Sequence, residues 1–434
     1  MSKFIINGPT KLKGEIKTNA AKNSAVAILC ACASIKGTTI LTNVPVIEEV
    51  KRIIEILTSI GLNCSWLDQH KLKIINSGNL KTEKINKQSF IKTRSGILLA
   101  GSLVAGLAKF NLPKPSGCKL GKRTVNPHII TLAHLGVSLK CTNKFYKIAR
   151  KKLKAANFTM YESSDTATET AIMAACLIQG KTEINMASAN YMVQDLCYFL
   201  KKAGARINGI GTNKLTISGV KKLKPVLNYP IMPDPIESMA FISLAITTKS
   251  SLNITHCPFD FLSLELEKLR LMGQKFKLSK LYKSSNKKFN LIDIKITPSP
   301  LKSLPDKIYA RPFPGLNIDN LPLFVPILTQ TKGKTLVHDW VYENRAIYYT
   351  ELNKLGANIE LLDPHRALVT GPSALRSAEI ICPPALRPSI NLLICMLAAR
   401  GKSILRNSYS IDRGYENIVD RLKKLGANIE RVDV

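Results

Sequence analysis

Leu355–Glu360 reads LGANIE, and the same six letters return at Leu425–Glu430. In each copy the glycine can adopt the left-handed conformation that stops a helix, and the alternating residues after it would start a strand. Shorter versions of this phrase lie at Ile60–Leu62, Leu135–Val137, Ala203–Ala205 and Met272–Gln274. Six near-regular occurrences indicate a repeat of about 70 residues, long enough for a small βαβ-type unit.

A second phrase alternates with the first: a helix of small apolar residues, then Gly, then a short strand containing Thr or Ser. It occurs at Gly37–Ile40, Gly180–Ile184, Gly333–Leu336 and Gly401–Ile404, with a degraded copy at Thr248–Leu252. The helices of these units, such as residues 164–179 and 386–400, are apolar nearly all round, so they must be buried on every side. The pattern therefore predicts two domains of three units each, with helices packed inside rings of sheets.

Composition supports a globular chain of two domains. The 434 residues exceed what one hydrophobic core usually serves, and 45% hydrophobic with 21% charged residues excludes a disordered chain. The apolar runs at residues 25–33 and 97–108 are too short or too interrupted by glycine to span a bilayer. Because the first residues read as a strand, we expect no signal peptide. The ten cysteines form no CxxC pair or zinc-type cluster. We expect a soluble protein of the reducing cytoplasm, with no metal and no cofactor.

Charge is the most unusual feature of the composition. Lys plus Arg number 63 against 30 for Asp plus Glu, a net charge of +33. Such a balance suggests an anionic partner, yet the lysine runs at residues 151–154, 221–224 and 275–288 carry no interleaved aromatic stacking platform. We expect a solvated surface that attracts anionic small molecules, with neither nucleic acid nor membrane as partner.

Cys118 stands apart from the other cysteines, most of which lie in apolar stretches. It follows Pro115-Ser116-Gly117 and is close to Lys119, Lys122 and Arg123. A thiol in a loop beside cations has a lowered pKa and becomes reactive. The residues alone leave open whether Cys118 is such a thiol or an ordinary loop cysteine.

Several charged residues occupy loop-like contexts away from the lysine-rich faces. Lys22 opens an apolar helix, where a helix N-terminus attracts anions. Five arginines that could bind phosphate or carboxylate as forks lie beside Pro, Asn or Gly or just before an apolar helix: Arg94, Arg123, Arg345, Arg387 and Arg413. Asp319 precedes a buried helix, so it is either an N-cap or, in a cation-rich cleft, a general base.

Several of these residues lie in stretches that resemble a known enzyme family. The pieces Ala21–Asn23, Gly117–Arg123, Glu343–Arg345 and Ile411–Glu416, together with the sixfold repeat, resemble the UDP-N-acetylglucosamine 1-carboxyvinyltransferases. These are MurA-type enolpyruvyl transferases of the EPSP synthase-like family, and the likeness covers the whole chain. The resemblance implies an α/β fold of two inside-out α/β barrels, each of three βαβαββ repeats with buried helices. One domain would span residues 22–231 and carry the Cys118 loop, the other residues 1–21 and 232–434, with the active-site cleft between them.

The resemblance also implies the reaction: phosphoenolpyruvate (PEP) plus UDP-N-acetylglucosamine gives the 3-enolpyruvyl ether and phosphate by addition and elimination. Cys118 would protonate PEP and be the residue that fosfomycin alkylates, Asp319 would be the base, and Lys22 would complete the catalytic set. The chain would act as a cytoplasmic monomer in peptidoglycan synthesis, and so in cell wall biogenesis, cell shape and cell division. The implied substrate-binding positions are Lys22, Asn23, Arg94, Arg123, Thr124, Val125, Asn126, Pro127, Ser164, Asp319, Val341, Arg345, Arg387 and Arg413.

The sequence departs from the family pattern at several positions: Asn126, Glu162, Asp165, Ala189, Pro235 and Ala385. Of these, Asn126, Glu162 and Asp165 belong to the nucleotide side of the family's site. Glu162 replaces a lysine, which puts a negative charge where a diphosphate is expected. One hypothesis is therefore retained PEP chemistry with altered nucleotide-sugar binding, or a paralogue without catalysis. The related transferase of the shikimate pathway shares the repeat but not the loop cysteine. An RNA-end cyclase shares part of the repeat and is supported by charge alone.

Overall fold

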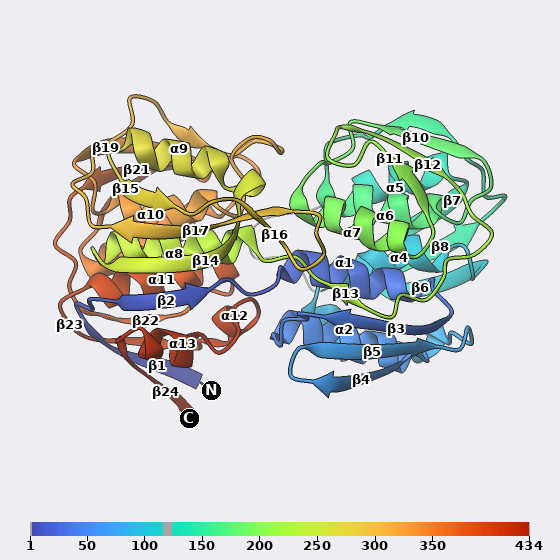
Figure 1. Cartoon of the computed structure of the whole chain (residues 1–434), viewed down its shortest axis with the longest axis horizontal. Helices are drawn as coiled ribbons and strands as arrows, with labels where there is room; N and C mark the ends of the chain where they lie inside the picture. Colours follow the sequence, from blue (N-terminus) through green and yellow to red (C-terminus); the bar gives the residue numbers. More distant parts are fainter. Residues whose placement is uncertain (1, 116–123, 434) are drawn as a thin grey trace. The chain divides into compact units, whose positions relative to one another are not determined.

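The computed structural model describes residues 2–115 and 124–433, which divide into two compact units. The first unit comprises residues 20–115 and 124–232, and the second comprises residues 2–19 and 233–433. Each unit contains three sheets and a set of buried helices (Figure 1). Among the described residues the chain passes from one unit to the other at positions 19/20 and 232/233.

The first unit consists of three successive segments of helices and strands. The first holds α1 (Lys22–Cys32), β3 (Gly37–Thr42), α2 (Glu48–Ser59), β4 (Asn63–Asp68) and β5 (Lys71–Asn76). The second holds η1 (Thr82–Lys84), α3 (Lys87–Lys92), η2 (Ser95–Leu98), α4 (Leu99–Leu103), β6 (Lys109–Pro113), α5 (Asn126–His134), β7 (Val137–Cys141) and β8 (Phe145–Arg150). The third holds β9 (Asn157–Thr159), α6 (Asp165–Ala175), β10 (Lys181–Asn185), α7 (Tyr191–Lys202), β11 (Arg206–Asn208), β12 (Lys214–Ser218) and β13 (Tyr229–Pro230).

The second unit begins with β1 (Ser2–Gly8) and β2 (Lys13–Lys17) and continues after the first unit. Its next segment holds α8 (Pro235–Thr247), β14 (Ser251–Pro258), η3 (Phe259–Phe261), α9 (Ser263–Leu271), β15 (Lys275–Leu278), β16 (Tyr282–Lys283) and β17 (Asn290–Thr297). Then come β18 (Ile308–Tyr309), η4 (Leu321–Leu323), α10 (Phe324–Leu328), β19 (Gly333–His338), η5 (Ala346–Leu355), β20 (Asn358–Asp363) and β21 (Arg366–Gly371). The last segment holds β22 (Glu379–Ile381), α11 (Leu386–Ala398), β23 (Gly401–Arg406), α12 (Tyr409–Asp412), α13 (Ile418–Lys424) and β24 (Asn428–Asp433).

Five of the six sheets of the described chain share one topology, and the three-stranded sheet β6-β8-β7 has antiparallel pairs only. In the order β11-β12-β10-β9, the strands β9 and β10 are parallel across the crossover helix α6, and β12 is antiparallel to both neighbours. This is a βαβαββ unit, and the sheet β18-β19-β21-β20 repeats it. The other sheets of the units run β13-β3-β5-β4, β6-β8-β7, β22-β23-β1-β24 and β15-β17-β14-β2. Three of them borrow a strand from far along the chain, since β1 pairs with β23 and β24, β2 pairs with β14, and β13 pairs with β3.

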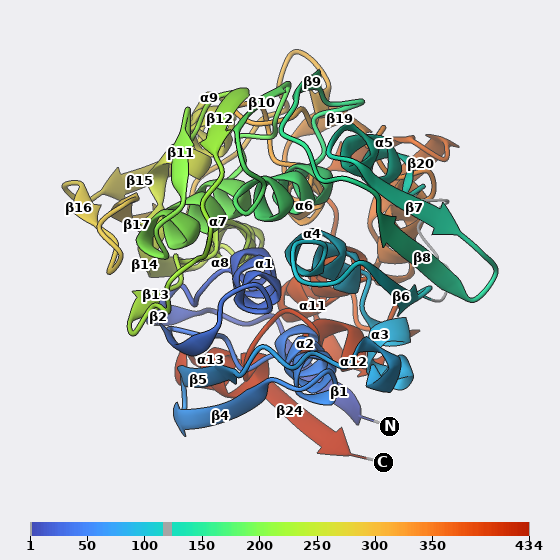
Figure 2. The ribbon, with the colours of Figure 1, turned by 90° about the vertical axis from the view of Figure 1, so that its right-hand side faces the viewer.

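Helices lie inside and sheets outside in each unit. Figure 2 shows the sheets of the first unit around α1, α4 and α6, and α4 contacts both α1 and α6. In the second unit α8, α10 and α11 make the corresponding contacts, and every residue of α8 is buried. The prediction that apolar helices are buried on all sides is confirmed, because α6 and α11 fall within the predicted ranges and are almost wholly buried.

The repeated glycines end their helices as predicted. All six adopt positive φ, between 84° and 109°: Gly61, Gly136, Gly204, Gly273, Gly356 and Gly426. At Gly136 a side chain would also clash, because an added Cβ would lie 2.2 Å from the carbonyl oxygen of Lys152. Glycine is therefore required at this turn for two independent reasons.

Helix length also bears on the membrane question. The longest helices of the described chain, α8 and α11, have 13 residues each. A bilayer-spanning helix needs about 20. No helix among the described residues is long and apolar enough to cross a membrane.

Candidate active site

Asp319 lies between two arginines in the loop that leads from β18 to η4. Its Oδ1 is 3.5 Å from Nη1 of Arg345, and its Oδ2 is 3.5 Å from Nη2 of Arg387. Both arginines are nearly buried, whereas the Asp319 side chain keeps 22% of its surface exposed. The second unit therefore brings together three of the predicted site residues, with the carboxylate still accessible.

Local hydrogen bonds fix the loop that carries Asp319. The Asn317 side-chain oxygen accepts from the Asp319 N–H at 2.9 Å. Glu265 of α9 accepts from the Asn320 side-chain amide at 2.7 Å and from the Asn317 N–H at 3.4 Å. Burial raises the pKa of Glu265 to about 6, and the hydrogen bond from Asn320 limits the rise. The orientation of Asp319 thus depends on a buried acid, Glu265, which sequence reasoning did not single out.

Arg345 is held from several sides. Nε and Nη2 donate to the two oxygens of Asp339 at 2.5 and 2.9 Å, and Nη2 also donates to the Ile318 carbonyl at 2.7 Å. The guanidinium carbon lies 4.1 Å from the centre of the Tyr342 ring, a cation–π contact. Burial by itself lowers the pKa of Arg345, but the charge of Asp339 outweighs it and raises the pKa above its usual value.

Arg387 lies in the first turn of α11. Its Nη1 donates to the Tyr415 hydroxyl at 3.1 Å. Tyr415 is two residues after Arg413, which follows directly on α12. Ala385, the N-cap of α11, has no side chain that could orient Arg387, so Tyr415 and Asp319 provide its support instead. Val341, in the loop after β19, is 44% exposed.

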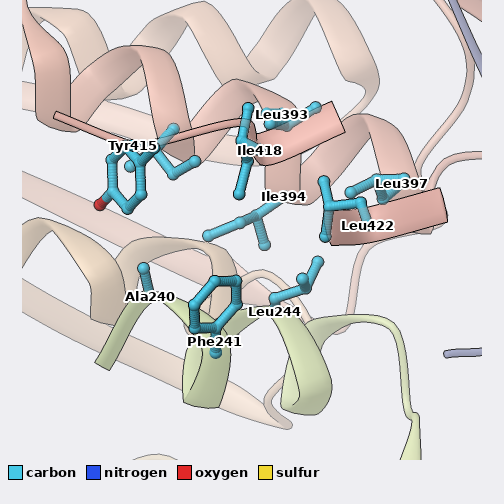
Figure 3. A pocket seen from close by; sticks show the side chains of 10 residues that line it. Ala240, Phe241, Leu244, Leu393, Ile394, Leu397, Tyr415, Ile418 and Leu422 are labelled. Carbon is cyan, nitrogen blue, oxygen red and sulfur yellow. The ribbon is translucent and has the colours of Figure 1, made fainter. Parts of the chain in front are cut away.

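An apolar cavity lies behind Tyr415, between α8, α11 and α13. Figure 3 shows the Tyr415 ring at one end of it, with Phe241 and Leu244 on one side and Leu393 on the other. A cavity lined this way offers nothing to an anionic substrate. We assign it to the packing that holds the Tyr415 ring while its hydroxyl meets Arg387.

In the first unit the predicted residues lie at helix N-termini. Lys22 is the first residue of α1 and is half-buried. The Asn23 side-chain amide donates to the hydroxyl of Tyr191, the first residue of α7, at 3.0 Å. Ser164 precedes α6 as its N-cap. Anions are favoured at such positions because the unsatisfied N–H groups and the helix dipole point at them.

His128 of α5 is a member of this group that sequence reasoning missed. Its Nδ1 is 3.3 Å from Oγ1 of Thr170 and its Nε2 is 3.2 Å from Oγ1 of Thr166, both on α6. Burial, aided by the charge of Arg94, lowers the pKa of His128 to about 4, so the ring is neutral near pH 7. The signal in the sequence that could have identified it is a histidine directly after Asn126-Pro127, at the start of a helix.

Residues 124–127 of the predicted set lie at the start of α5, and Arg94 is the N-cap of η2. Oγ1 of Thr124 accepts from the Asn126 N–H at 3.0 Å, Val125 is the N-cap and Pro127 is buried. Cys118 and Arg123 lie outside the described residues. These two predictions therefore rest on the sequence.

Four of the departures from the family pattern lie in different surroundings. Asp165 accepts from the Ser188 hydroxyl at 2.5 Å and from the Asn190 side-chain amide at 3.2 Å. Pro235 is the first residue of α8, whose N-cap Asp234 accepts from the Ile236 N–H at 2.8 Å. Ala189 is buried, whereas Glu162 is exposed.

Comparison with known proteins agrees with this geometry. The model of the family described as EPSP synthase (3-phosphoshikimate 1-carboxyvinyltransferase) matches residues 6–422. The chain belongs to this family. Members curated as UDP-N-acetylglucosamine 1-carboxyvinyltransferase are 36% identical in Treponema denticola, over 99% of both chains, and 35% identical in Borreliella burgdorferi, over 100% of this chain and 99% of the relative. The family prediction is confirmed.

Solved structures of other members share the fold. The enolpyruvyl transferase NikO from Streptomyces tendae has a TM-score of 0.86 at 21% identity, over 100% of this chain and 99% of that one. EPSP synthase from Acinetobacter baumannii has a TM-score of 0.76 at 17% identity, over 100% of both chains. The predicted fold class is confirmed.

Proposed function

We propose that this protein transfers the enolpyruvyl group of PEP to the 3-hydroxyl of UDP-N-acetylglucosamine and releases phosphate. This is the first committed step of peptidoglycan precursor synthesis. The observation that carries the proposal is the 36% identity, over 99% of both chains, with a relative curated as the transferase of this reaction. The cluster of Asp319, Arg345 and Arg387 at positions taken from the family pattern supports it.

The addition step needs one base and one acid. As the sugar hydroxyl oxygen bonds to C2 of PEP, Asp319 takes the hydroxyl proton and the Cys118 thiol supplies a proton to C3, which gives a tetrahedral ketal. In the elimination step the bond from C2 to the phosphate oxygen breaks, the Cys118 thiolate takes a proton from C3 as the double bond returns, and the phosphate leaves with the proton that Asp319 had taken. Asp319 suits its role because the arginines fix its position while part of its surface stays accessible.

Fixed cations would hold the two anionic groups of PEP. Lys22, Arg123, Arg387 and Arg413 are assigned to the phosphate and the carboxylate, since arginine forks and helix N-termini bind both. Asn23, Arg94, Ser164, Val341 and residues 124–127 are assigned to the acceptor. Preorganised charges of this kind stabilise the developing charge without reorganisation during the reaction.

We also propose the setting of the reaction. The chain works in the cytoplasm as a monomer on these two small molecules, and it needs no cofactor.

Two alternative functions predict different products in one assay. The family model carries the name of the shikimate-pathway enzyme, and the departures at Glu162 and Asp165 favour a paralogue with altered acceptor binding. The test incubates the purified protein with PEP and either UDP-N-acetylglucosamine or shikimate 3-phosphate, with product detection by mass spectrometry. We expect an enolpyruvyl ether of UDP-N-acetylglucosamine only. Product from shikimate 3-phosphate alone would overturn the acceptor, and no product from either, with PEP still protecting Cys118 from alkylation, would indicate a non-catalytic paralogue.

A further inference from the structure

Asp339 directly follows β19 and is fully buried, and no role in the reaction has been assigned to it above. Its N–H donates to the His365 carbonyl at 2.7 Å, and its own carbonyl oxygen lies 3.0 Å from Nδ1 of His365. Besides Arg345, its carboxylate accepts from the hydroxyl of Tyr349, at 2.5 Å from Oδ2. Tyr349 lies on η5 and is 1% exposed. Both the backbone and the side chain of Asp339 are therefore fixed.

The N–H donors of Arg345 show how Asp339 orients the guanidinium group. Nε and one N–H of Nη2 go to Asp339, and the other N–H of Nη2 goes to the Ile318 carbonyl. These bonds fix the plane of the guanidinium, and with the plane fixed, Nη1 faces Asp319. A bidentate pair fixes orientation in a way that a single contact cannot.

The protonation state of Tyr349 suits a hydrogen-bond donor to Asp339. Burial, with the added effect of the Asp339 charge, raises the pKa of Tyr349 well above its usual value. The phenol therefore stays protonated, and its O–H donates a hydrogen bond to Asp339. This bond leaves Oδ2 of Asp339 with two donors, Tyr349 and Nε of Arg345.

We propose that Asp339 and Tyr349 are positioning residues for the transfer reaction, which act through Arg345 to hold Asp319 in place. The inference rests on the proposed function. A base must meet its proton within hydrogen-bond reach, and small misplacements reduce the rate of the chemical step more than they reduce substrate binding. Loss of the pair should therefore lower kcat and leave KM for both substrates nearly unchanged.

The test compares kcat and KM of Asp339→Asn and Tyr349→Phe with the unmodified protein. Glu351→Gln is the control, because Glu351 lies on η5 near Tyr349 but pairs with Lys354 at the surface. We expect Asp339→Asn to lower kcat about 10- to 100-fold. Tyr349→Phe should lower it a few-fold, about the effect of one lost hydrogen bond, and the control should equal the unmodified protein. Circular dichroism and thermal unfolding show whether each variant folds.

The outcomes distinguish a failure of the positioning role from a failure of the proposed function. A folded Asp339→Asn variant with the kcat of the control, or one whose loss lies wholly in KM, would overturn the inference. If Asp339→Asn does not fold, Tyr349→Phe decides in the same way. If the unmodified protein forms no product, the proposed function fails and the inference fails with it.

Discussion

Replacing Glu265 with glutamine tests how the loop of Asp319 is held. Glutamine keeps an acceptor oxygen for Asn320 and Asn317 and adds an N–H donor, so it imitates the protonated acid. The change therefore removes the titration of residue 265 but preserves its hydrogen bonds. The expected difference between the two proteins appears only as pH changes.

The magnitude follows from the pKa. Burial raises the pKa of Glu265 from 4.5 to about 6. The folded protein thus binds more protons than the unfolded chain between these values, and stability falls as pH rises through this window. A shift of this size corresponds to about 2 kcal/mol in the free energy of unfolding. Glu265→Gln lacks this loss, so it gains about 2 kcal/mol relative to the unmodified protein between pH 4 and pH 7.

Urea unfolding at several pH values measures this difference. Glu267→Gln is the control, because Glu267 is on the same helix but exposed, and its hydrogen bond with Arg270 lowers its pKa instead. The control should show no gain as pH rises. A stability difference between Glu265→Gln and the unmodified protein that stays constant with pH would refute the reasoning. The transferase kcat of Glu265→Gln should match that of the unmodified protein at pH 7.5.

Three further changes test other parts of the structure. Tyr415→Phe removes the acceptor of Arg387 and should lower kcat/KM for PEP about 5- to 10-fold; an unchanged value in steady-state assays would contradict the role of this contact. Leu393→Ala enlarges an apolar cavity and should reduce the free energy of unfolding by about 2–5 kcal/mol; urea unfolding measures this, and a loss below 1 kcal/mol would mean that the helices close over the space. Because the pKa of His128 is lowered to about 4, the protein should lose stability as pH falls from 6.5 to 4; His128→Gln should flatten this loss in acid unfolding, and an equally steep loss would show that other groups cause it.

The fold could be predicted from the sequence because its determinants are local. A glycine with positive φ stops each helix wherever the Leu-Gly phrase occurs, as at Gly356 and Gly426. Helices without a polar face, such as α8, have no option but burial. The borrowed strands were beyond local reasoning, since β1 and β24 lie at opposite ends of the chain.

The site was less predictable because its residues come from distant parts of the chain. Asp319, Arg345 and Arg387 belong to three separate segments, and no spacing rule says that they converge, so the family resemblance had to supply them. The residues that sequence reasoning missed, Asp339 and His128 among them, are buried polar groups whose partners come from other elements. A lone aspartate after a strand has no local signal that distinguishes an N-cap from the partner of a buried arginine.

The most direct test of the central claim measures phosphate release. The purified protein is mixed with PEP, with and without UDP-N-acetylglucosamine, and Cys118→Ala is measured beside it. The account predicts release that depends on the acceptor and collapses in the variant. Release that is independent of the acceptor, or equally fast in Cys118→Ala, would contradict it.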